Sequence, residues 1–254
     1  MKKVIHDLKV VKNKQLNENH FILELKASEP LPEILPGQFV EVLVDNSKST
    51  FLRRPISIHD VDYNENTISL YIKNVGEGTN QLSYAEVDDY INVVYPLGNG
   101  FSPANSDKIL LIGGGCGVAP LLYLAKSIFE KGITPTILIG GRSKNDILEL
   151  EQYQKYGNVL ITTEDGSFCE KGFVTNHPVL ESTSFTKIYT CGPEPMMKSV
   201  GRYATSKGIE CEVSLENMMA CGIGACLCCV TPTQEGNKCV CTEGPVFNIK
   251  ELKW

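Results

Sequence analysis

The sequence lacks the features of several large classes of protein. It has no cluster of basic residues, since 24 Lys and Arg are outnumbered by 30 Asp and Glu and the net charge is -6. Because phosphate neutralisation needs clustered cations, we expect no nucleic-acid partner. Internal repeats and low-complexity segments are also absent, and 42% hydrophobic and 21% charged residues are ordinary for a globular chain.

Long apolar runs are missing as well. At the N-terminus, Asp7 and Lys9 interrupt the stretch where a secretory signal would have its apolar core. The uncharged, mainly apolar run of residues 109–125 has 17 residues. A bilayer span needs roughly 20. We therefore expect a cytoplasmic protein with no membrane association.

Histidine is scarce and scattered. His6, His20, His59 and His177 show no spacing typical of metal ligands. We expect them at surface or capping positions.

Cysteine, in contrast, is abundant, and six of the ten cysteines lie between residues 221 and 241. In a reducing compartment, clustered cysteines bind metal more often than they form disulfides. Cys221, Cys226 and Cys229 form C-x4-C-x2-C, and Cys241 follows. This spacing is typical of plant-type [2Fe–2S] ferredoxins, in which a tight loop supplies three thiolates and a separate segment the fourth. Cys228 and Cys239 have no assigned role.

A zinc site remains an alternative for these cysteines. It would use Cys226, Cys229, Cys239 and Cys241. The closing C-x-C is cramped for a tetrahedral site, and Cys221 would have no function. The spacing favours the iron–sulfur interpretation.

The rest of the chain has two patterns of apolar residues. Up to about residue 100, short alternating apolar segments are separated by Pro, Gly, Asn and Asp, which predicts an antiparallel barrel with one short helix around 80–87. From about 107, strands alternate with helices expected near 144–156 and 196–207, which predicts a parallel sheet with crossovers. From about 216 the chain is loop-like and has little core of its own.

Two turns of the second region are candidates for binding a dinucleotide. The sequence GGGCGVAP at 113–120 follows a strand and opens a helix, and CGPEPMM at 191–197 does the same. Such turns present free N–H groups and the positive end of a helix dipole to a pyrophosphate. Tight turns also use glycine for backbone reasons alone, so each motif is weak by itself.

The barrel region has its own candidate anion site. Arg53 and Arg54 stand at the start of one strand, and Gly76-Glu77-Gly78-Thr79 precedes the short helix. A basic strand end facing a helix N-terminus could hold the diphosphate of a flavin.

These motifs together resemble a known family. R-P-I-S at 54–57, G-E-G-T at 76–79, GGGCGVAPL, CGPEPMM and the cysteine tail ending in C-T-E-G-P-V-F are similar to the electron-transfer subunits of bacterial dihydroorotate dehydrogenase B, within the ferredoxin reductase superfamily. The resemblance extends along nearly the whole chain. It implies a flavin-binding β-barrel domain at 1–102, an NAD-binding α/β domain at 103–215 and a [2Fe–2S] module at 216–254.

The resemblance also implies site residues. The iron ligands would be Cys221, Cys226, Cys229 and Cys241. FAD would be held by Arg54, Pro55, Ile56, Ser57, Tyr71, Ile72, Lys73, Gly78 and Thr79, although Ile56 stands where many reductases stack a tyrosine on the flavin. NAD, as substrate, would contact Gly113, Gly114, Gly115, Cys116, Gly117, Cys191, Gly192 and Pro193, with Cys191 near the nicotinamide ring. No residue is assigned a catalytic role.

Electron counting then orders the cofactors. NADH exchanges electrons as a pair, the cluster exchanges one at a time, and a flavin can do both. Only 13 residues follow Cys241, so the last electron carrier should lie on another protein. The resemblance makes that partner an FMN-containing catalytic subunit, in a heterotetramer of two plus two, with electrons flowing outward to NAD+ during pyrimidine biosynthesis.

Two alternatives remain open. The same machinery could serve another complex, such as a sulfide dehydrogenase or a glutamate synthase-like reductase, and Gly141-Arg142-Ser143 could read the 2′-phosphate of NADP. In a different class, the chain would be a zinc-stabilised binding module with a vestigial α/β domain.

Overall fold

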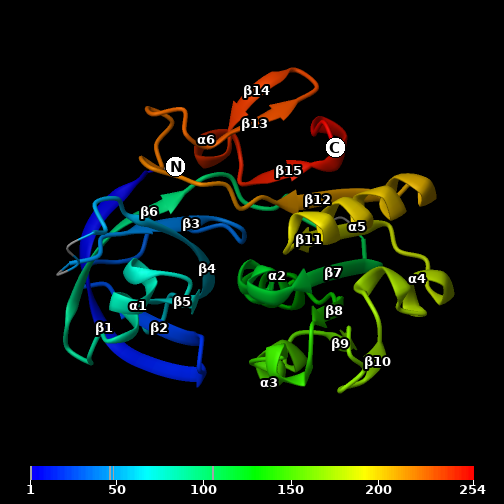
Figure 1. The fold of residues 1–254 in the computed structure, drawn as a ribbon, viewed down its shortest axis with the longest axis horizontal. Helices are drawn as coiled ribbons and strands as arrows, with labels where there is room; N and C mark the ends of the chain where they lie inside the picture. Colours follow the sequence, from blue (N-terminus) through cyan, green and yellow to red (C-terminus); the bar gives the residue numbers. More distant parts are fainter. Residues whose placement is uncertain (1, 46, 48, 105) are drawn as a thin grey trace.

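The computed structural model describes residues 2–45, 47, 49–104 and 106–254. Figure 1 shows a barrel and a sheet domain side by side, with the C-terminal segment lying across their junction. None of the described helices is long and apolar enough to span a bilayer.

The N-terminal body is a closed six-stranded antiparallel barrel with the order β1-β2-β5-β4-β3-β6. Its strands are β1 (Val4–Asn17), β2 (His20–Lys26), β3 (Phe39–Val42), β4 (Arg54–Asp62), β5 (Thr67–Lys73) and β6 (Tyr90–Leu97). Alternating apolar side chains such as Val40 and Val42 fill the interior. The predicted barrel is confirmed.

The short helix of the barrel, α1 (Glu77–Ser83), begins earlier than expected. The Thr79 hydroxyl accepts hydrogen bonds from the backbone N–H groups of Val75 and Gly76, at 2.9 and 3.2 Å. These bonds satisfy donors at the helix start, so the helix begins at Glu77 rather than near Asn80.

The second body is built on a seven-stranded sheet with the order β10-β9-β8-β7-β11-β12-β15. Its strands are β7 (Ile109–Gly114), β8 (Thr136–Gly141), β9 (Asn158–Thr163), β10 (Glu170–Lys171), β11 (Lys187–Cys191), β12 (Glu210–Ser214) and β15 (Val246–Asn248). All neighbouring strands are parallel except β12 and β15. The predicted parallel sheet is confirmed.

Helices cover both faces of this sheet (Figure 1). Ile109 and Leu111 pack with α2 (Ala119–Phe129) and α3 (Leu150–Gln154) on one face. Leu110 and Ile112 pack with α4 (Val179–Ser182) and α5 (Glu194–Lys207) on the other. The alternation along β7 therefore builds two hydrophobic layers, as expected for a strand buried on both sides.

The helix expected over 144–156 is divided. A 3-10 turn, η2 (Lys144–Asp146), comes first, and α3 begins only after Glu149, which has φ 54°. A left-handed residue cannot continue a right-handed helix, so the chain makes two short elements instead of one. Single-turn 3-10 helices also occur as η1 (Gly115–Val118), η3 (Val174–Asn176) and η4 (Ile249–Glu251).

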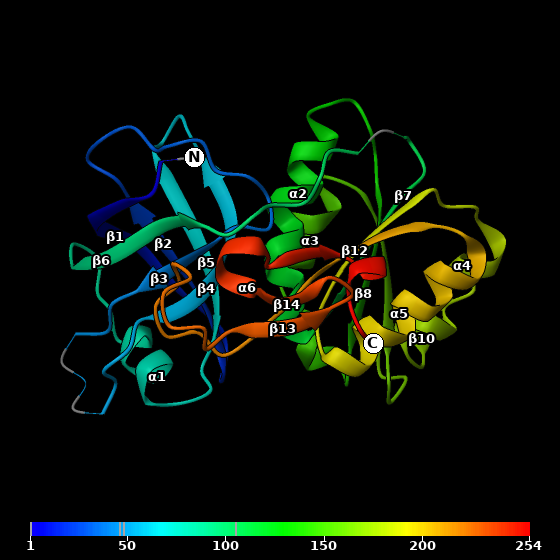
Figure 2. The same cartoon turned by 90° about the horizontal axis from the view of Figure 1, so that it is seen from above.

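The C-terminal segment crosses the junction of the two bodies (Figure 2). It contains a hairpin of β13 (Val230–Thr233) and β14 (Gly236–Cys239), then α6 (Val240–Glu243). β15 then pairs with β12, so this segment also completes the edge of the large sheet. The domain boundaries at 102/103 and 215/216 stay predictions.

Two histidines lie in the interior, so the expectation of surface or capping positions was wrong for His20 and His59. His59 on β4 is 2% exposed, and its Nδ1–H donates to the carbonyl of Ala119 on α2 at 2.8 Å. Its Nε2 has no partner among the described residues. Burial lowers the pKa of His59, opposed by the Ala119 hydrogen bond, so the imidazole is held neutral between the barrel and α2.

This burial predicts a pH-dependent stability. Below pH 6.5 the unfolded chain binds a proton at His59 that the folded protein excludes, so the free energy of unfolding falls by up to about 1.4 kcal/mol per pH unit. The variant His59→Asn keeps an N–H donor for Ala119 but cannot titrate. Thermal unfolding of the flavin-loaded protein at pH 7.5 and 5.5 should show a smaller loss of Tm in the variant. For each kcal/mol of unfolding free energy that the wild type loses and the variant keeps, the two losses of Tm should differ by about 2–4 °C. Equal losses would contradict the prediction.

Candidate functional site

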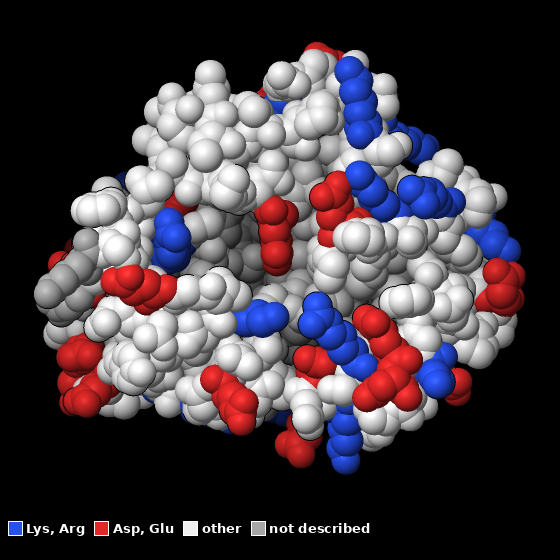
Figure 3. Space-filling model, viewed as in Figure 1, with Lys and Arg blue, Asp and Glu red and all other residues white. Residues whose placement is uncertain are grey.

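A cavity of about 1200 Å³ lies between the barrel and the sheet domain. Figure 3 shows it as a hollow with acidic and basic side chains around its rim. Most of the residues predicted to contact FAD or NAD line it: Arg54, Pro55, Ile56, Ser57, Tyr71, Ile72, Lys73, Thr79, Gly114, Gly115, Cys116, Gly117, Gly192 and Pro193. The predicted contacts Gly78, Gly113 and Cys191 are not among its lining residues.

The two arginines of the barrel motif have different positions. Arg53 donates to the carbonyls of Glu41 and Asn92, at 3.2 and 3.1 Å, and so holds neighbouring strands together. Arg54 lines the cavity beside α1. A Cβ added at Gly78 would lie 3.1 Å from Arg54 Cδ, so the glycine lets the arginine cross the start of the helix. A cation against a helix N-terminus is a suitable cradle for the diphosphate of FAD.

The two predicted dinucleotide turns lie side by side. β7 and β11 are adjacent and parallel, and their register places Gly113 opposite Cys191. A Cβ added at Gly117 would lie 2.3 Å from the carbonyl of Cys191 and from the nitrogen of Gly192. Only glycine permits this approach, which brings both turns to the same edge of the sheet, where ligands of open α/β sheets bind.

Burial keeps the thiols beside these turns protonated. Cys191 is 1% exposed, and burial raises its pKa well above the usual value. Burial also raises the pKa of Cys116, to about 11. Since the thiolate is the reactive form of cysteine, neither side chain is an activated nucleophile.

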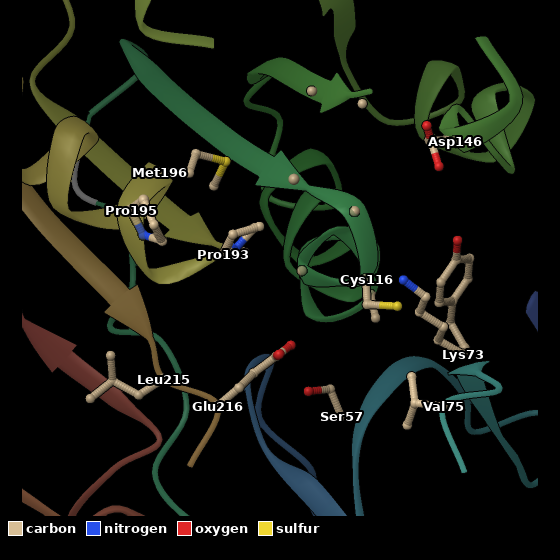
Figure 4. A pocket seen from close by; sticks show the side chains of 18 of the residues that line it. Ser57, Lys73, Val75, Cys116, Asp146, Pro193, Pro195, Met196, Leu215 and Glu216 are labelled. Carbon is tan, nitrogen blue, oxygen red and sulfur yellow. The ribbon is translucent and has the colours of Figure 1, made fainter. Parts of the chain in front are cut away.

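A carboxyl group that the sequence motifs did not reveal lies in the cavity. In Figure 4 the Glu216 carboxylate and the Ser57 hydroxyl point toward the same space, with Cys116 and Lys73 across it. Burial raises the pKa of Glu216, and the positive charge of Lys73 opposes the rise. A carboxyl group with a raised pKa in a cavity is a candidate for proton transfer. The available signal was its position directly after the strand of residues 210–214, at the carboxyl edge of the sheet.

The outer end of the cavity carries charges of both signs. Arg142, after β8, and Glu164, after β9, both line it. The N–H of Asp165 donates to the Arg142 carbonyl at 3.1 Å, so the two loops run together. The sequence offered Arg142 as a reader of a 2′-phosphate, whereas no motif indicated Glu164, which follows a different strand.

The cysteine loop arranges backbone donors around its sulfur atoms. Burial raises the pKa of Cys221, but hydrogen bonds from the N–H groups of Ile223 and Cys226 outweigh it and lower the pKa to about 6. The N–H of Gly224 donates to Cys241 Sγ at 3.2 Å, and that of Cys241 donates to Cys229 Sγ at 3.4 Å. N–H groups directed at thiolates are typical of iron–sulfur sites.

The thiols of this loop lie close to one another. The side chain of Cys226 interacts with Cys221, and that of Cys229 interacts with both Cys239 and Cys241. Among the described residues, no group of three His, Cys, Asp or Glu side chains is arranged to hold a metal ion, so the choice of four ligands stays a prediction.

The two remaining cysteines of the cluster region differ in position. Cys239 is buried and its side chain is close to Cys229, whereas Cys228 is exposed and lines the cavity. Cys228 therefore places the cluster loop at the wall of the same cavity as Arg54 and the glycine turns.

Comparison with known sequences identifies two domains and a set of relatives. Residues 216–253 match the family model described as the iron–sulfur cluster binding domain of dihydroorotate dehydrogenase B, and residues 111–202 match the oxidoreductase NAD-binding domain. The chain is 36% identical over 260 residues to the dihydroorotate dehydrogenase B (NAD(+)) electron transfer subunit of Shouchella clausii, covering 99% of each chain. It is 39% identical over 251 residues to the subunit of that name from Geobacillus sp. strain WCH70, covering 96% of each.

Solved structures show the same architecture. One reported for the NADH-dependent reduced ferredoxin-NADP oxidoreductase, in a study of flavin-based electron bifurcation, superposes with a TM-score of 0.88 at 30% identity. The match covers 98% of this chain and 90% of that one. The ferredoxin reductase of carbazole 1,9a-dioxygenase shares the fold, with a TM-score of 0.69 at 21% identity over 82% of this chain and 67% of that one. With its barrel, parallel sheet and cysteine module in this order, the chain belongs to the family of electron transfer subunits of dihydroorotate dehydrogenase B (NAD(+)).

Proposed function

We propose that this chain is the electron transfer subunit of an NAD-dependent dihydroorotate dehydrogenase. Its partner is an FMN-containing catalytic subunit that oxidises dihydroorotate to orotate, and the assembly contains two copies of each chain in the cytoplasm. The oxidation releases two electrons and two protons. NAD+ takes both electrons and one proton as a hydride, and the other proton passes to solvent.

One observation carries this proposal: a single cavity is lined by the predicted FAD and NAD residues and by Cys228, which precedes the proposed cluster ligand Cys229. Arg54 and Ser57 of the barrel, the glycine turn at 114–117 and Cys228 of the cluster loop all line it. A bound flavin exchanges electron pairs with NAD and single electrons with an iron–sulfur cluster. A flavin held by the barrel would therefore lie between the other two sites.

The residues of this chain bind and orient the cofactors. Arg54 neutralises the flavin diphosphate, and the turns after β7 and β11 hold the diphosphate of NAD with their N–H groups. Cys221, Cys226, Cys229 and Cys241 hold the cluster. Glu216 and Ser57 are the polar groups placed to move a proton within the cavity.

A second candidate function uses the same cofactors with another partner protein. The chain would then be an NAD(P)H reductase subunit of another complex, which the likeness to a ferredoxin-NADP oxidoreductase at 30% identity and the presence of Arg142 in the cavity favour. The two functions differ in the partner protein and in the pyridine nucleotide used.

Anaerobic reduction separates these functions. In the flavin-loaded and cluster-loaded protein, NADH should reduce FAD and the cluster at least about tenfold faster than NADPH, because Glu164 would repel a 2′-phosphate. Flavin and cluster absorbance are followed separately. Copurification from the native cell should recover a dihydroorotate dehydrogenase subunit, and recovery of a different flavoprotein would overturn the proposal.

The ligand assignment predicts different outcomes for two neighbouring cysteines. Cys221→Ser should lose the cluster but retain FAD, because it removes a thiol that backbone N–H groups stabilise as the thiolate. Cys228→Ser is the matched control and should retain the cluster. Iron and sulfide content and visible absorbance measure the result, and the opposite pattern would refute the choice of ligands.

The close approach at Gly117 predicts a selective loss of NAD binding. In Gly117→Ala the new methyl group would overlap the backbone at Cys191 and Gly192, which separates the two turns. We expect the KM for NADH to rise at least about tenfold while FAD remains bound. Gly201→Ala on α5 is the control, since its Cβ would make only ordinary contacts at 3.6 Å. An unchanged KM in Gly117→Ala would contradict this role.

A further inference from the structure

A carboxyl group without a hydrogen-bond partner lies on the outer face of the barrel, where the cysteine loop that contains Gly222 covers it. Glu41 on β3 is 1% exposed, and neither of its carboxylate oxygens has a partner among the described residues. Burying an unpaired carboxyl group costs free energy that an apolar residue at the same position would not cost. Nothing in the cavity chemistry accounts for it, because Glu41 does not line the cavity.

The strand register directs Glu41 toward the cluster. Val40 and Val42, its neighbours on β3, belong to the barrel core, so the intervening side chain points to the outer face. There it touches the cysteine loop, since a Cβ added at Gly222 would lie 2.6 Å from Glu41 Cγ and 3.0 Å from Oε1. Gly222 directly follows Cys221 and has φ 65°, a conformation that favours glycine.

The nearby cations leave the carboxyl group without an ion pair. Arg53 donates to the backbone carbonyl of Glu41, and Arg54 lines the cavity, which Glu41 does not. Burial raises the pKa of Glu41 to about 7, Arg54 and Arg53 oppose the rise, and Cys221 adds to it. The Glu41 carboxyl group therefore lies against the turn that follows Cys221, in a contact from which water is excluded.

We propose that Glu41 is a positioning residue for electron transfer, whose negative charge beside the Cys221 turn lowers the reduction potential of the [2Fe–2S] cluster. Reduction adds an electron to the cluster, and a fixed anion close by destabilises the reduced form. Net charge, hydrogen bonding and solvent exposure are the means by which proteins adjust such potentials. A lower potential favours passing each electron on from the cluster to the flavin, which is the direction of the proposed function on which this inference rests.

The test is a redox titration of the loaded protein at pH 9, followed by the electron paramagnetic resonance signal of the reduced cluster. Glu41→Gln keeps the shape and removes the charge. It should raise the midpoint potential of the cluster by about 59 mV. At the same applied potential, the ratio of reduced to oxidised cluster then rises about tenfold, since the couple transfers one electron. Glu41→Asp keeps the charge and should restore most of the wild-type potential.

Glu65→Gln is the matched control, because it removes one charge from an exposed turn of the same barrel. Its cluster potential should equal that of the wild type. An unchanged potential in Glu41→Gln, or an equal shift in Glu65→Gln, would overturn the inference. So would loss of iron from both Glu41 variants, which would make Glu41 a packing residue. A wild-type protein that carries no reducible cluster would instead refute the proposed function.

Discussion

The antiparallel pairing of β15 with β12 is the constraint that places the cysteine segment against the proposed FAD and NAD sites. Leu215 leaves β12 and its N–H donates to the carbonyl of Pro245 at 2.9 Å, so residues 216–244 form a loop closed at the sheet edge. The loop is also fixed to the barrel, since the N–H of Asn99 donates to the Gly244 carbonyl at 2.6 Å. These hydrogen bonds hold the cysteine segment against both the sheet domain and the barrel, which explains why it reaches the wall of the cavity between them.

The contact between the barrel and α2 is the second support of the cavity. The Tyr123 hydroxyl donates to the Ile34 carbonyl at 3.1 Å, and Lys126 forms an ion pair with Asp60 at 3.0 Å. Together with the buried His59, these bonds join α2 to the barrel rather than leaving a mobile interface. A flavin in the barrel and a nicotinamide at the glycine turn would thus be held at a fixed relative position, as hydride transfer requires.

Burial then determines the protonation states around the electron path. The thiols of Cys191 and Cys116 are kept protonated and unreactive, and Glu216 and Glu41 have raised pKa values. Cys221 is the exception, because backbone N–H groups outweigh its burial. The same protein interior therefore disfavours thiolates along the cavity and favours one at the cluster, where metal binding needs it.

The sequence by itself determined the elements and the chemistry that depends on local spacing. The alternating segments of residues 1–100 predicted a barrel, the strand–turn–helix pattern after 107 predicted a parallel sheet, and the cysteine spacing predicted four cluster ligands that stay proposals. It did not predict the break at Glu149, because a single left-handed residue leaves little trace in an apolar pattern. Only the tertiary structure decided that Arg53 supports the barrel while Arg54 faces the cavity, that His59 is buried, and that Glu216, Glu164 and Glu41 stand where they do. These properties depend on which strands become neighbours, and residues as far apart as Glu41 and Gly222 meet only when the chain has folded.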